Sequence, residues 1–527
     1  MSAPAEPAVG AWAPLRRGLF LAFWLANLAS LIGTWVQEVG AAWLMTTLTD
    51  DPLPVALIQS AASLPVLVLA LPAGALADVF DRRRLLLVAQ GWMLLVALAL
   101  GLLTLGGAAS PALLLASTLL LGVGAALNAP VWQAVLPELV DDAELPAAVA
   151  LGSVGFNVAR AVGPALGGAL VAAAGPGIAF LVNAGSFLGV LGVVALWRRP
   201  RPELQLPPET VLASVIGGLR YVRHEPAVRA VLVRVGAFML CGSALWSLLP
   251  VIAKQELQVG ALAYGLLLGS LGLGAVLGAL GLAQLRERTS TDALVAGATV
   301  VLAGVVLTVA HLRSFPALCA VLLVGGAAWL ALLSSFNTAV QTLVAAWVRG
   351  RAVALYLLVF AGGASLGGLG WGVLASRASS GVALSAGAAG LIGGLILIPW
   401  FRLPRARPEG LAPAQAWQTP PSGVNPGAGP VVVSVDYRVA TGDVEAFRAA
   451  LVALRQARLR TGAFAWALLE DLDEPGRFVE QFQVATWGGH LHQHERVSHA
   501  EQALQTEAEA FHQGPERPQV RHLLLRR

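Results

Sequence analysis

An acidic and a basic side chain lie in the middle of long apolar stretches. Glu38 follows Trp35 and Gln37 in one stretch, and Arg160 follows Asn157 in another. If these stretches cross a membrane, a charge at mid-depth costs about 2.5–3.5 kcal/mol on insertion scales, so it must face protein or water. Glu38 is therefore a candidate proton carrier, with a hydrogen-bonded acid, or one close to the outer surface, as the alternative. Arg160 is a candidate for binding an anionic group or pairing with Glu38, with a fixed structural pair as the alternative.

Amide and indole side chains supply a second set of candidates. Asn128 and Gln133, near the end of the fourth apolar stretch, are echoed by Asn337 and Gln341 in the tenth. Corresponding polar positions in two halves of a transporter are where a midplane binding site is expected. The predicted cavity-lining residues are Trp35, Gln37, Asn128, Trp132, Gln133, Asn157, Asn337 and Gln341.

A short charged turn follows the second apolar stretch. We expect Gly74 to allow close approach of two helices, and Asp78 and Arg82 to dock against helix ends or opposite charges. Such contacts would form a latch that holds in one conformation and breaks in another. Arg83 belongs to the same candidate set, although for Arg83 and Arg84 plain anchoring at the membrane surface is the favoured interpretation.

The composition excludes an ordinary soluble enzyme for most of the length. Hydrophobic residues make up 57% of the 527 residues and charged residues only 12%, whereas soluble chains average about 25% charged. A membrane-spanning helix needs about 20 mostly apolar residues, which predicts twelve spans. Their approximate ranges are 18–46, 53–77, 85–106, 111–136, 146–174, 177–197, 229–253, 262–285, 292–311, 316–345, 351–376 and 380–401.

The arginines support this count. Most lie in alternate connections, whereas Lys254, Arg313 and Arg377 lie on the opposite side. Basic residues gather on the cytoplasmic side of membrane proteins, so both termini are predicted to be cytoplasmic. We also expect Arg234, near the start of the seventh span, to extend toward the cytoplasmic surface.

The chain repeats itself. The segment 74–84 is echoed by 278–288, and Gly163-Pro-x-x-Gly-Gly168 by Gly363-x-x-Leu-Gly-Gly368. We therefore predict an all-α polytopic membrane protein with twelve transmembrane helices in two six-helix parallel repeats. The predicted organisation is a disordered tail at 1–14, a six-helix half at 15–200, a linker with an amphipathic helix at 201–228, a second half at 229–403, a Pro-rich linker at 404–430 and a soluble domain at 431–527.

The last segment, 431–527, has the pattern of a ferredoxin-like α+β domain. Strands are predicted at 431–439, 462–470, 477–485 and 519–525, with a helix around Phe447 and a helical stretch over 488–512. His490 and His494 share a helical face, with His492 and His499 nearby. Because no cysteine or well-spaced acid completes a ligand set, we expect a solvated face and no metal site.

These motifs resemble a known family. Gly74-x-Leu76-Ala77-Asp78 with Arg82 and Arg83 is similar to the inter-helix signature of the major facilitator superfamily. The core of that superfamily's antiporter motif is matched by Gly163, Pro164, Gly167 and Gly168. The resemblance implies that these residues seal the transporter against leak, and the alternative is that they serve generic helix packing. The segments 78–84, 460–466 and 487–496 resemble the transmembrane secretion effector branch, related to the enterobactin exporter. Val79, Asp81 and Leu282 depart from the superfamily pattern.

The resemblance implies a secondary transporter in the bacterial inner membrane that exports a siderophore-like or drug-like molecule by alternating access and proton antiport. Its expected partners are the substrate, protons, lipid and, through the C-terminal domain, a second copy; neither nucleic acid nor a cofactor is expected. A P-loop is absent from the sequence, which argues against ATP-driven pumping. Three rivals remain open: a membrane-tethered enzyme whose last domain resembles small monooxygenase-like folds, a regulatory domain, and uptake in place of export.

Overall fold

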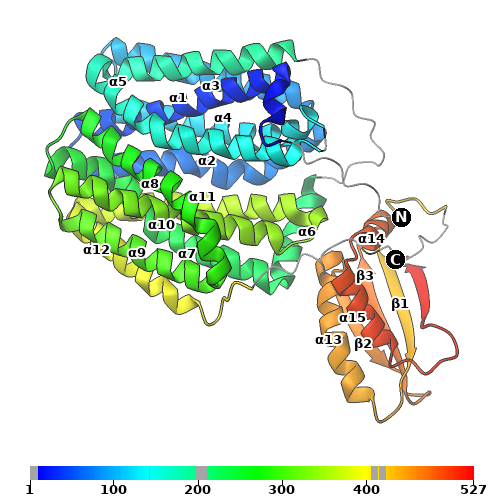
Figure 1. Ribbon diagram of the computed structural model, residues 1–527. Helices are drawn as coiled ribbons and strands as arrows, with labels where there is room; N and C mark the ends of the chain where they lie inside the picture. The colour runs from blue at the N-terminus through cyan, green and yellow to red at the C-terminus, as the bar shows by residue number, and fades with distance from the viewer. Residues whose placement is uncertain (1–9, 142, 198–210, 405–413, 415–422, 527) are drawn as a thin grey trace. The chain divides into compact units, whose positions relative to one another are not determined.

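The computed structural model describes residues 10–141, 143–197, 211–404, 414 and 423–526 (Figure 1). Most of the predicted tail at 1–14 and of the predicted linker at 404–430 therefore lies outside the described residues, as do residues 201–210 of the other predicted linker and the side chain of Asp78. The chain forms two compact units. The first comprises Met1–Val211, Leu232–Phe336 and Ala354–Arg402, and the second comprises Leu212–Val231, Asn337–Val353 and Leu403–Arg527.

The first unit is a bundle of long apolar helices. Before the linker these are α1 (Gly18–Leu48), α2 (Pro52–Val79), α3 (Arg82–Leu105), α4 (Pro111–Val135) and α5 (Leu145–Leu196), with short 3-10 turns at Ala13–Arg16 and Leu136–Glu138. After it come α7 (Pro226–Val251), a π-helical turn at Ile252–Glu256, α8 (Ala261–Arg288), α9 (Thr291–His311), α10 (Phe315–Thr342), α11 (Arg349–Arg377) and α12 (Ser380–Gly394). A short turn also lies at Leu395–Leu397. The turn at Ala346–Val348 belongs to the second unit, as do the start of α7, the end of α10 and the start of α11.

Short polar residues define where several helices begin. The side chains of Asp51, Asp81 and Ser110 each accept a hydrogen bond from a backbone N–H in the first turn of α2, α3 and α4. Ser290 and Ser379 do the same for α9 and α12. These caps satisfy backbone donors that a helix leaves free at its start, so the starts of these five helices are marked by their own sequence.

Among the described residues, eleven helices are long and apolar enough to cross a membrane. The number differs from the twelve predicted because 146–174 and 177–197 fall within α5, which is 52 residues long. At about 1.5 Å per residue an unbroken helix of that length would span roughly 78 Å, more than twice the apolar thickness of a bilayer. The backbone of α5 leaves the helical region at Gly175, where φ is 80° and ψ is 166°.

The part of α5 before Gly175 runs in the same direction as α1. A Cβ placed on Gly155 would lie 3.5 Å from the Trp24 indole, and one on Gly163 would lie 2.6 Å from the Cβ of Trp35. The later residue of α5 therefore contacts the later residue of α1, as expected for two helices that run in the same direction.

The part after Gly175 runs in the opposite direction. A Cβ on Gly33 would lie 2.6 Å from the Oγ of Ser186, and one on Gly40 would lie 3.1 Å from Phe180. Here the order is reversed, so α5 folds back on itself at Gly175, and both of its parts pack against α1.

Two glycine-lined contacts connect early and late helices of the bundle. Between α5 and α8, a Cβ on Gly168 would lie 2.9 Å from the Cα of Gly265. Between α2 and α11, the Ser60 hydroxyl donates a hydrogen bond of 2.7 Å to the Ser365 carbonyl oxygen, and a Cβ on Gly368 would lie 2.6 Å from the same hydroxyl. Small residues let the backbones approach closely in both pairs.

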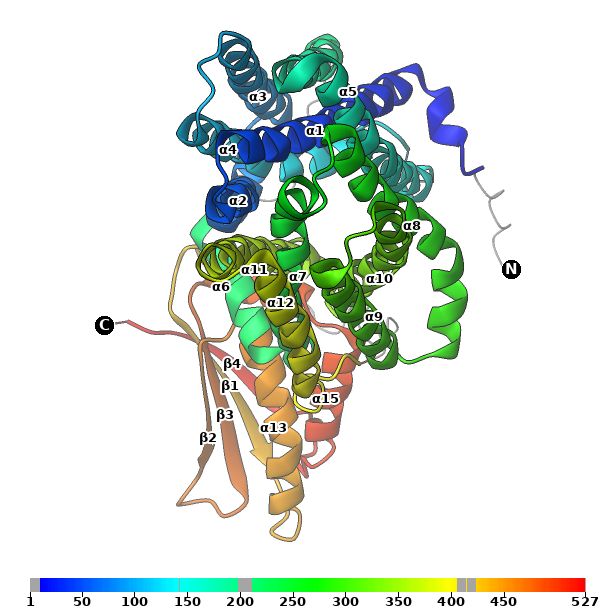
Figure 2. The same ribbon diagram turned by 90° about the vertical axis from the view of Figure 1, so that its left-hand side faces the viewer.

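The second unit contains a four-stranded antiparallel sheet in the order β2-β3-β1-β4. Its elements are β1 (Val431–Arg438), α13 (Val444–Thr461), β2 (Ala465–Glu470), β3 (Arg477–Val484), α14 (Trp487–Glu495), α15 (His499–Glu509) and β4 (Gln519–Leu524). Alternate residues of β1 and β3 are buried, and Figure 2 shows α13 and α15 on one side of the sheet. The strand order and the pairing are those of the predicted ferredoxin-like topology.

One detail of that prediction is wrong. The helical stretch expected over 488–512 consists of two helices, α14 and α15, that are separated at Ser498. The side chain of Ser498 accepts from the backbone N–H of Glu501, whose carboxylate accepts from the backbone N–H of Ser498. This capping box starts a new helix, so the apolar periodicity continues across a break in the backbone.

The second unit also includes α6 (Val211–His224), the helix predicted in the linker. Gly218 and Tyr221 are buried. The Tyr221 ring lies 5.6 Å from that of Trp347, and a Cβ on Gly218 would lie 3.1 Å from the Cβ of Arg351. This end of α6 therefore packs against protein.

Candidate functional site

A buried arginine without a counter-ion is the most unusual feature of the helical bundle. Arg160 on α5 is 5% exposed. Its Cζ lies 5.9 Å from the centre of the Trp246 ring on α7. Within the part of the chain that the structure describes, the Nε and Nη2 atoms of Arg160 and the Nε1 atom of Trp246 are buried and have no hydrogen-bond partner. Three donors from two helices thus lie close together without an acceptor.

Aromatic rings continue from this pair through the bundle. The Trp246 ring lies 6.3 Å from that of Trp35 on α1 and 5.5 Å from that of Trp329 on α10. Phe238 lies 5.1 Å from Trp329 and 5.9 Å from Phe336. The predicted cavity residue Trp35 therefore packs beside Trp246, the ring that contacts Arg160, and so does Trp329; the sequence analysis singled out neither Trp246 nor Trp329. Trp246 and Trp329 lie within apolar stretches, so the sequence carried no signal that distinguished them from packing residues.

Glu38 lies one helical turn after Trp35 on α1. Its side chain is exposed, and many protein atoms lie around it. Tyr264 on α8 is close enough to interact electrostatically with it, and the Tyr264 ring stacks on Trp43 at 6.0 Å. Among the described contacts there is no ion pair between Glu38 and Arg160, so both charges are available to a ligand or a proton.

Several predicted cavity residues pack or form hydrogen bonds within the bundle. Gln37 is buried and accepts a hydrogen bond of 3.0 Å from Asn183 on α5. Gln90 on α3 donates one of 3.0 Å to Asn128. The Trp132 ring lies 5.9 Å from Phe23 in an apolar cluster. These contacts give Asn128 and Trp132 partners within the bundle, whereas the side-chain nitrogen of Gln37 is buried with no described hydrogen-bond partner; the role of all three as cavity residues stays a prediction.

The remaining amide candidates lie on accessible surfaces of their helices. Asn157 donates to the carbonyl oxygen of Ser153 at 2.8 Å, and Gln133 is exposed. In the second unit, Gln341 donates to the side-chain oxygen of Asn337 at 2.6 Å, and both are exposed.

The predicted antiporter-type motif is a packing surface on α5. Gly163 faces Trp35, and a Cβ on Gly167 would lie 3.0 Å from the Cα of Val36 on α1. Gly168 faces α8, where the Pro164 carbonyl oxygen also lies against Gly265. One stretch of α5 thus touches α1 on one side and α8 on the other, directly after Arg160.

The predicted latch residues form part of an ionic cluster at the helix ends. The Nη1 atom of Arg82 lies 2.7 Å from Glu138 and 2.9 Å from the Ala134 carbonyl oxygen at the end of α4. At Gly74, a Cβ would meet no described atom within 4 Å, so the expected close approach there is wrong. The side chain of Asp78 lies outside the described residues.

Arg83 binds the end of another helix. Its Nε and Nη2 atoms donate to the carbonyl oxygens of Val194 and Ala195, at 3.1 Å and 2.6 Å. The last carbonyl groups of a helix carry partial negative charge, which a cation stabilises. Arg83 therefore ties the start of α3 to the end of α5, a contact beyond the anchoring that the sequence favoured.

The acidic connection between α4 and α5 also belongs to this cluster. Arg17 pairs with Asp141 and, at 2.6 Å, with Glu144. The sequence analysis missed this group, although three acids between two spans were a usable signal. In the later helices Arg234 is buried and paired with Asp292 in the first turn of α9. Its side chain thus reaches the start of a neighbouring helix, and its extension toward the cytoplasmic surface stays a prediction.

Comparison with known proteins identifies the family. Residues 9–527 match the family described as transmembrane secretion effectors. The chain belongs to this family. Secretion effectors of this kind are part of the major facilitator superfamily, so the chain is a multi-pass membrane protein of a transporter family.

Relatives of this secretion effector include siderophore and multidrug transporters. The Staphyloferrin A transporter of Staphylococcus aureus is 29% identical over 163 residues, 31% of this chain and 41% of that protein. The multidrug efflux pump Tap of Mycolicibacterium fortuitum is 29% identical over 243 residues, 44% of this chain and 59% of that protein. The chain thus matches about two fifths to three fifths of the length of these relatives.

Solved structures show the same fold for the helical bundle. A bacterial homologue of the human lysosomal transporter Spinster aligns with a TM-score of 0.56 and 16% identity, covering 74% of this chain and 96% of that one. A bacterial homologue of the iron transporter ferroportin aligns with a TM-score of 0.57 and 16% identity, covering 73% and 99%. At this identity the likeness extends to the fold alone.

Proposed function

We propose that this secretion effector is a secondary transporter that exports a small molecule carrying an acidic group. The observation that carries the proposal is the cluster of unpartnered donors on Arg160 and Trp246. A buried charge without a counter-ion is costly, so a protein that retains one gains from it when an anionic ligand binds. A carboxylate or a deprotonated hydroxyl of the substrate is the acceptor that these donors require.

The aromatic rings around Arg160 favour a ligand with a flat or apolar body. Trp246 lies against the guanidinium, and Trp35 and Trp329 pack against Trp246; aromatic surfaces of this kind bind aromatic and apolar groups in most small-molecule sites. An acidic group joined to an aromatic or apolar body fits siderophore-like and anionic drug-like molecules. The named relatives, which transport a siderophore and several drugs, point to the same classes.

Glu38 is the proposed proton carrier. It shares a face of α1 with Trp35, faces Tyr264 on α8 and lies in protein surroundings. A carboxyl group in such a place is characteristic of proton pathways in transporters. Exchange of a proton on Glu38 for the anionic substrate on Arg160 would couple export to the proton gradient.

Alternating access is proposed to come from rocking of two six-helix halves. Counting α5 as two crossings on either side of Gly175 gives twelve spans, with the arginine-rich connections and both termini in the cytoplasm. The contacts of α5 with α8 and of α2 with α11 are close and rich in glycine, which suits surfaces that pivot on one another. The ion pairs of Arg82 and Arg17 are proposed to hold the helix ends of the first half together as it moves.

Flux in sealed inverted vesicles tests this function. With an acidic lumen, proton antiport would drive anionic siderophores and drugs from the medium into the lumen. Accumulation that depends on the pH gradient is expected for at least one acidic compound and not for its uncharged ester. Accumulation confined to right-side-out vesicles would indicate uptake and would contradict export.

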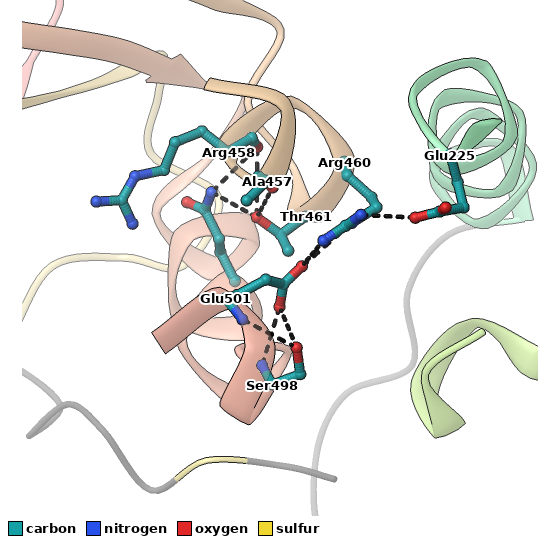
Figure 3. A network of polar contacts seen from close by, with 8 residues as sticks. Glu225, Ala457, Arg458, Arg460, Thr461, Ser498 and Glu501 are labelled. Carbon is teal, nitrogen blue, oxygen red and sulfur yellow. Dashed lines mark hydrogen bonds and ion pairs between the residues drawn. The ribbon is translucent and has the colours of Figure 1, made fainter. Parts of the chain in front are cut away.

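A regulatory role of the C-terminal domain is a second candidate, favoured by one contact network within the second unit. Arg460 at the end of α13 lies 2.6 Å from Glu225, directly after α6, and 2.8 Å from Glu501 on α15 (Figure 3). Arg220 on α6 donates at 2.6 Å to the carbonyl oxygen of Gly462. The domain is thereby attached to the helix that connects the two halves.

Replacing Arg460 tests this attachment. Arg460→Met removes both ion pairs and the contact of the guanidinium with the Tyr221 ring, and leaves an unbranched apolar side chain. If the domain regulates transport through α6, the variant alters the flux as strongly as deletion of 404–527. Arg448→Met is the matched control because the described ion pairs of Arg448 are with exposed carboxylates of its own domain, Glu445 and Glu470. Unchanged flux in the deletion variant would exclude regulation.

A further inference from the structure

Three histidines meet at the junction of α14 and β4. The imidazole nitrogens of His490, His494 and His522 lie within 4.8 Å of one another, and the Nε2 atoms of His490 and His494 are 2.9 Å apart. His490 is fully buried. The expectation of a solvated histidine face is therefore wrong for this residue, and the third member of the cluster comes from the last strand of the chain.

The local structure holds these rings in place. His490 and His494 are four residues apart on α14 and thus share one helical face. His522 pairs with the buried Val433 of β1 across the antiparallel ladder, which places it on the covered side of the sheet. The Trp487 ring lies 5.5 Å from both His490 and His522 and shields the cluster.

The protonation state of the cluster suits a metal ligand. Burial, reinforced by the charge of neighbouring imidazoles, lowers the pKa of His490 to about 3, and burial lowers that of His494 to about 4. Burial also lowers the pKa of His522. All three imidazoles are neutral at physiological pH, which is the form that binds transition metals.

A neighbouring amide selects the nitrogen that faces the cluster. The Gln493 side-chain nitrogen donates to the Thr461 hydroxyl at 3.0 Å, which fixes the orientation of the amide. Its oxygen then lies 3.3 Å from the Nδ1 atom of His490 and accepts from it. The Nε2 lone pair of His490 is left pointing into the cluster, an arrangement typical of metal-binding histidines.

The positive charge nearest to the cluster is partly compensated. Arg458 on α13 pairs with the buried Glu480 at 3.3 Å and lies 4.9 Å from the centre of the Phe482 ring. In addition to burial, its charge still lowers the pKa of His490 and His494, so a cation at the junction of α14 and β4 must bind against the part of this charge that Glu480 leaves uncompensated.

We propose that His490, His494 and His522 form a zinc site that joins α14 to β4. Three neutral imidazoles prefer zinc or a similar transition metal over magnesium or calcium, which prefer oxygen ligands. With zinc–nitrogen distances of about 2.0–2.1 Å, tetrahedral ligands lie roughly 3.3 Å apart. The rings thus need shifts on the order of 1 Å, and the fourth position remains open to water or a small anion. This site is separate from the proposed transport function.

The test uses the full-length protein purified in detergent with an affinity tag that contains no histidine. After treatment with a chelator, the protein is titrated with ZnCl2 and, separately, with CoCl2, whose visible absorption reports nitrogen ligands in a tetrahedral site. We expect one zinc ion per chain and a cobalt spectrum that zinc abolishes. His522→Gln and His494→Gln are expected to weaken zinc binding at least tenfold, because each removes one of three ligands.

Two further variants make the outcome specific. His499→Gln, on an exposed residue of the same domain, is expected to bind zinc like the wild type. Gln493→Leu is expected to weaken zinc binding about 10–100-fold, as is usual for loss of an outer-shell partner, with the far-ultraviolet circular dichroism unchanged. Failure of the wild-type chain to bind zinc or cobalt, or equal affinity in the His522→Gln variant, would overturn the proposal and leave a histidine hydrogen-bond pair.

Discussion

Replacing Arg160 by methionine separates a binding role from a structural one. Methionine retains part of the apolar stem of the side chain and removes the charge, all donors and the contact of the guanidinium with the Trp246 ring. In the ligand-free structure the Nε and Nη2 atoms of Arg160 have no acceptor among the described residues, so the substitution breaks no described hydrogen bond. The two roles therefore predict opposite results for ligand affinity and for thermal stability.

The expected loss of affinity follows from the two free donors. A hydrogen bond to a charged group contributes about 1.5–3 kcal/mol, and each 1.4 kcal/mol is a factor of ten in Kd. Loss of two such bonds raises the Kd for an anionic substrate at least about a hundredfold. Arg160→Lys keeps the charge but not the planar pair of donors, so this variant is expected to bind the anionic substrate roughly ten- to a hundredfold more weakly.

The effect on stability has the opposite sign. An uncompensated buried charge destabilises the ligand-free fold, so Arg160→Met is expected to raise the melting temperature of the ligand-free protein or leave it unchanged. In a fixed ion pair, removal of one partner would instead cost about 3–5 kcal/mol. The substrate would also lose its stabilising effect on the melting temperature of the variant.

The assay combines melting curves in detergent with equilibrium binding. Acidic siderophores and drugs are compared with their uncharged esters, and Arg402→Met, at an exposed position of the same unit, serves as the control. A lower melting temperature with unchanged affinity for every acidic compound would show that Arg160 is a structural residue and would refute the proposed substrate class.

Three further predictions concern other charges. Glu38→Gln is expected to abolish flux driven by a pH gradient while substrate binding persists; unaltered flux would remove Glu38 from the mechanism. Glu480→Gln removes the buried carboxylate that pairs with Arg458 and is expected to destabilise the C-terminal domain by about 3–5 kcal/mol. The exposed control, Glu470→Gln, is expected to cost about 0–1 kcal/mol. Both are measured by hydrogen exchange in β1 and β3, and equal effects would contradict a stabilising role for the buried ion pair. Because burial holds the pKa of His490 near 3, the unfolded chain binds more protons below about pH 6.5. The domain should therefore lose stability as the pH falls below that value, and metal-free His490→Leu should show a flatter pH profile in the same exchange experiment.

The apolar stretches and short caps made most of the fold predictable. Helix boundaries follow from residues such as Asp51, Ser110 and Ser379, which are local signals. The break at Gly175 was also predicted, since Gly-Pro interrupts the apolar run between 174 and 177. The split at Ser498 was missed because the apolar spacing carries on past it, and only the Ser498–Glu501 spacing could have revealed the cap.

The candidate site was predictable only in part. Arg160 and Glu38 stand out because a charge within an apolar stretch is rare. Their surroundings depend on long-range packing, so the sequence could not distinguish Trp246 from other tryptophans. His522 shows the same limit. It lies beside His490 because β4 pairs with β1, and a pattern within either segment alone does not reveal that pairing.

Accessibility of the α5 face that carries Arg160 tests the central claim most directly. Cys241 and Cys319 are replaced by serine, and Asn157→Cys, one helical turn before Arg160, introduces a single thiol. A membrane-impermeant thiol reagent is then applied to right-side-out and to inverted vesicles. Alternating access predicts that the thiol reacts from both sides, and that the proton gradient shifts the reaction toward one side at the expense of the other. Reaction from one side only, whatever the gradient, would contradict the account.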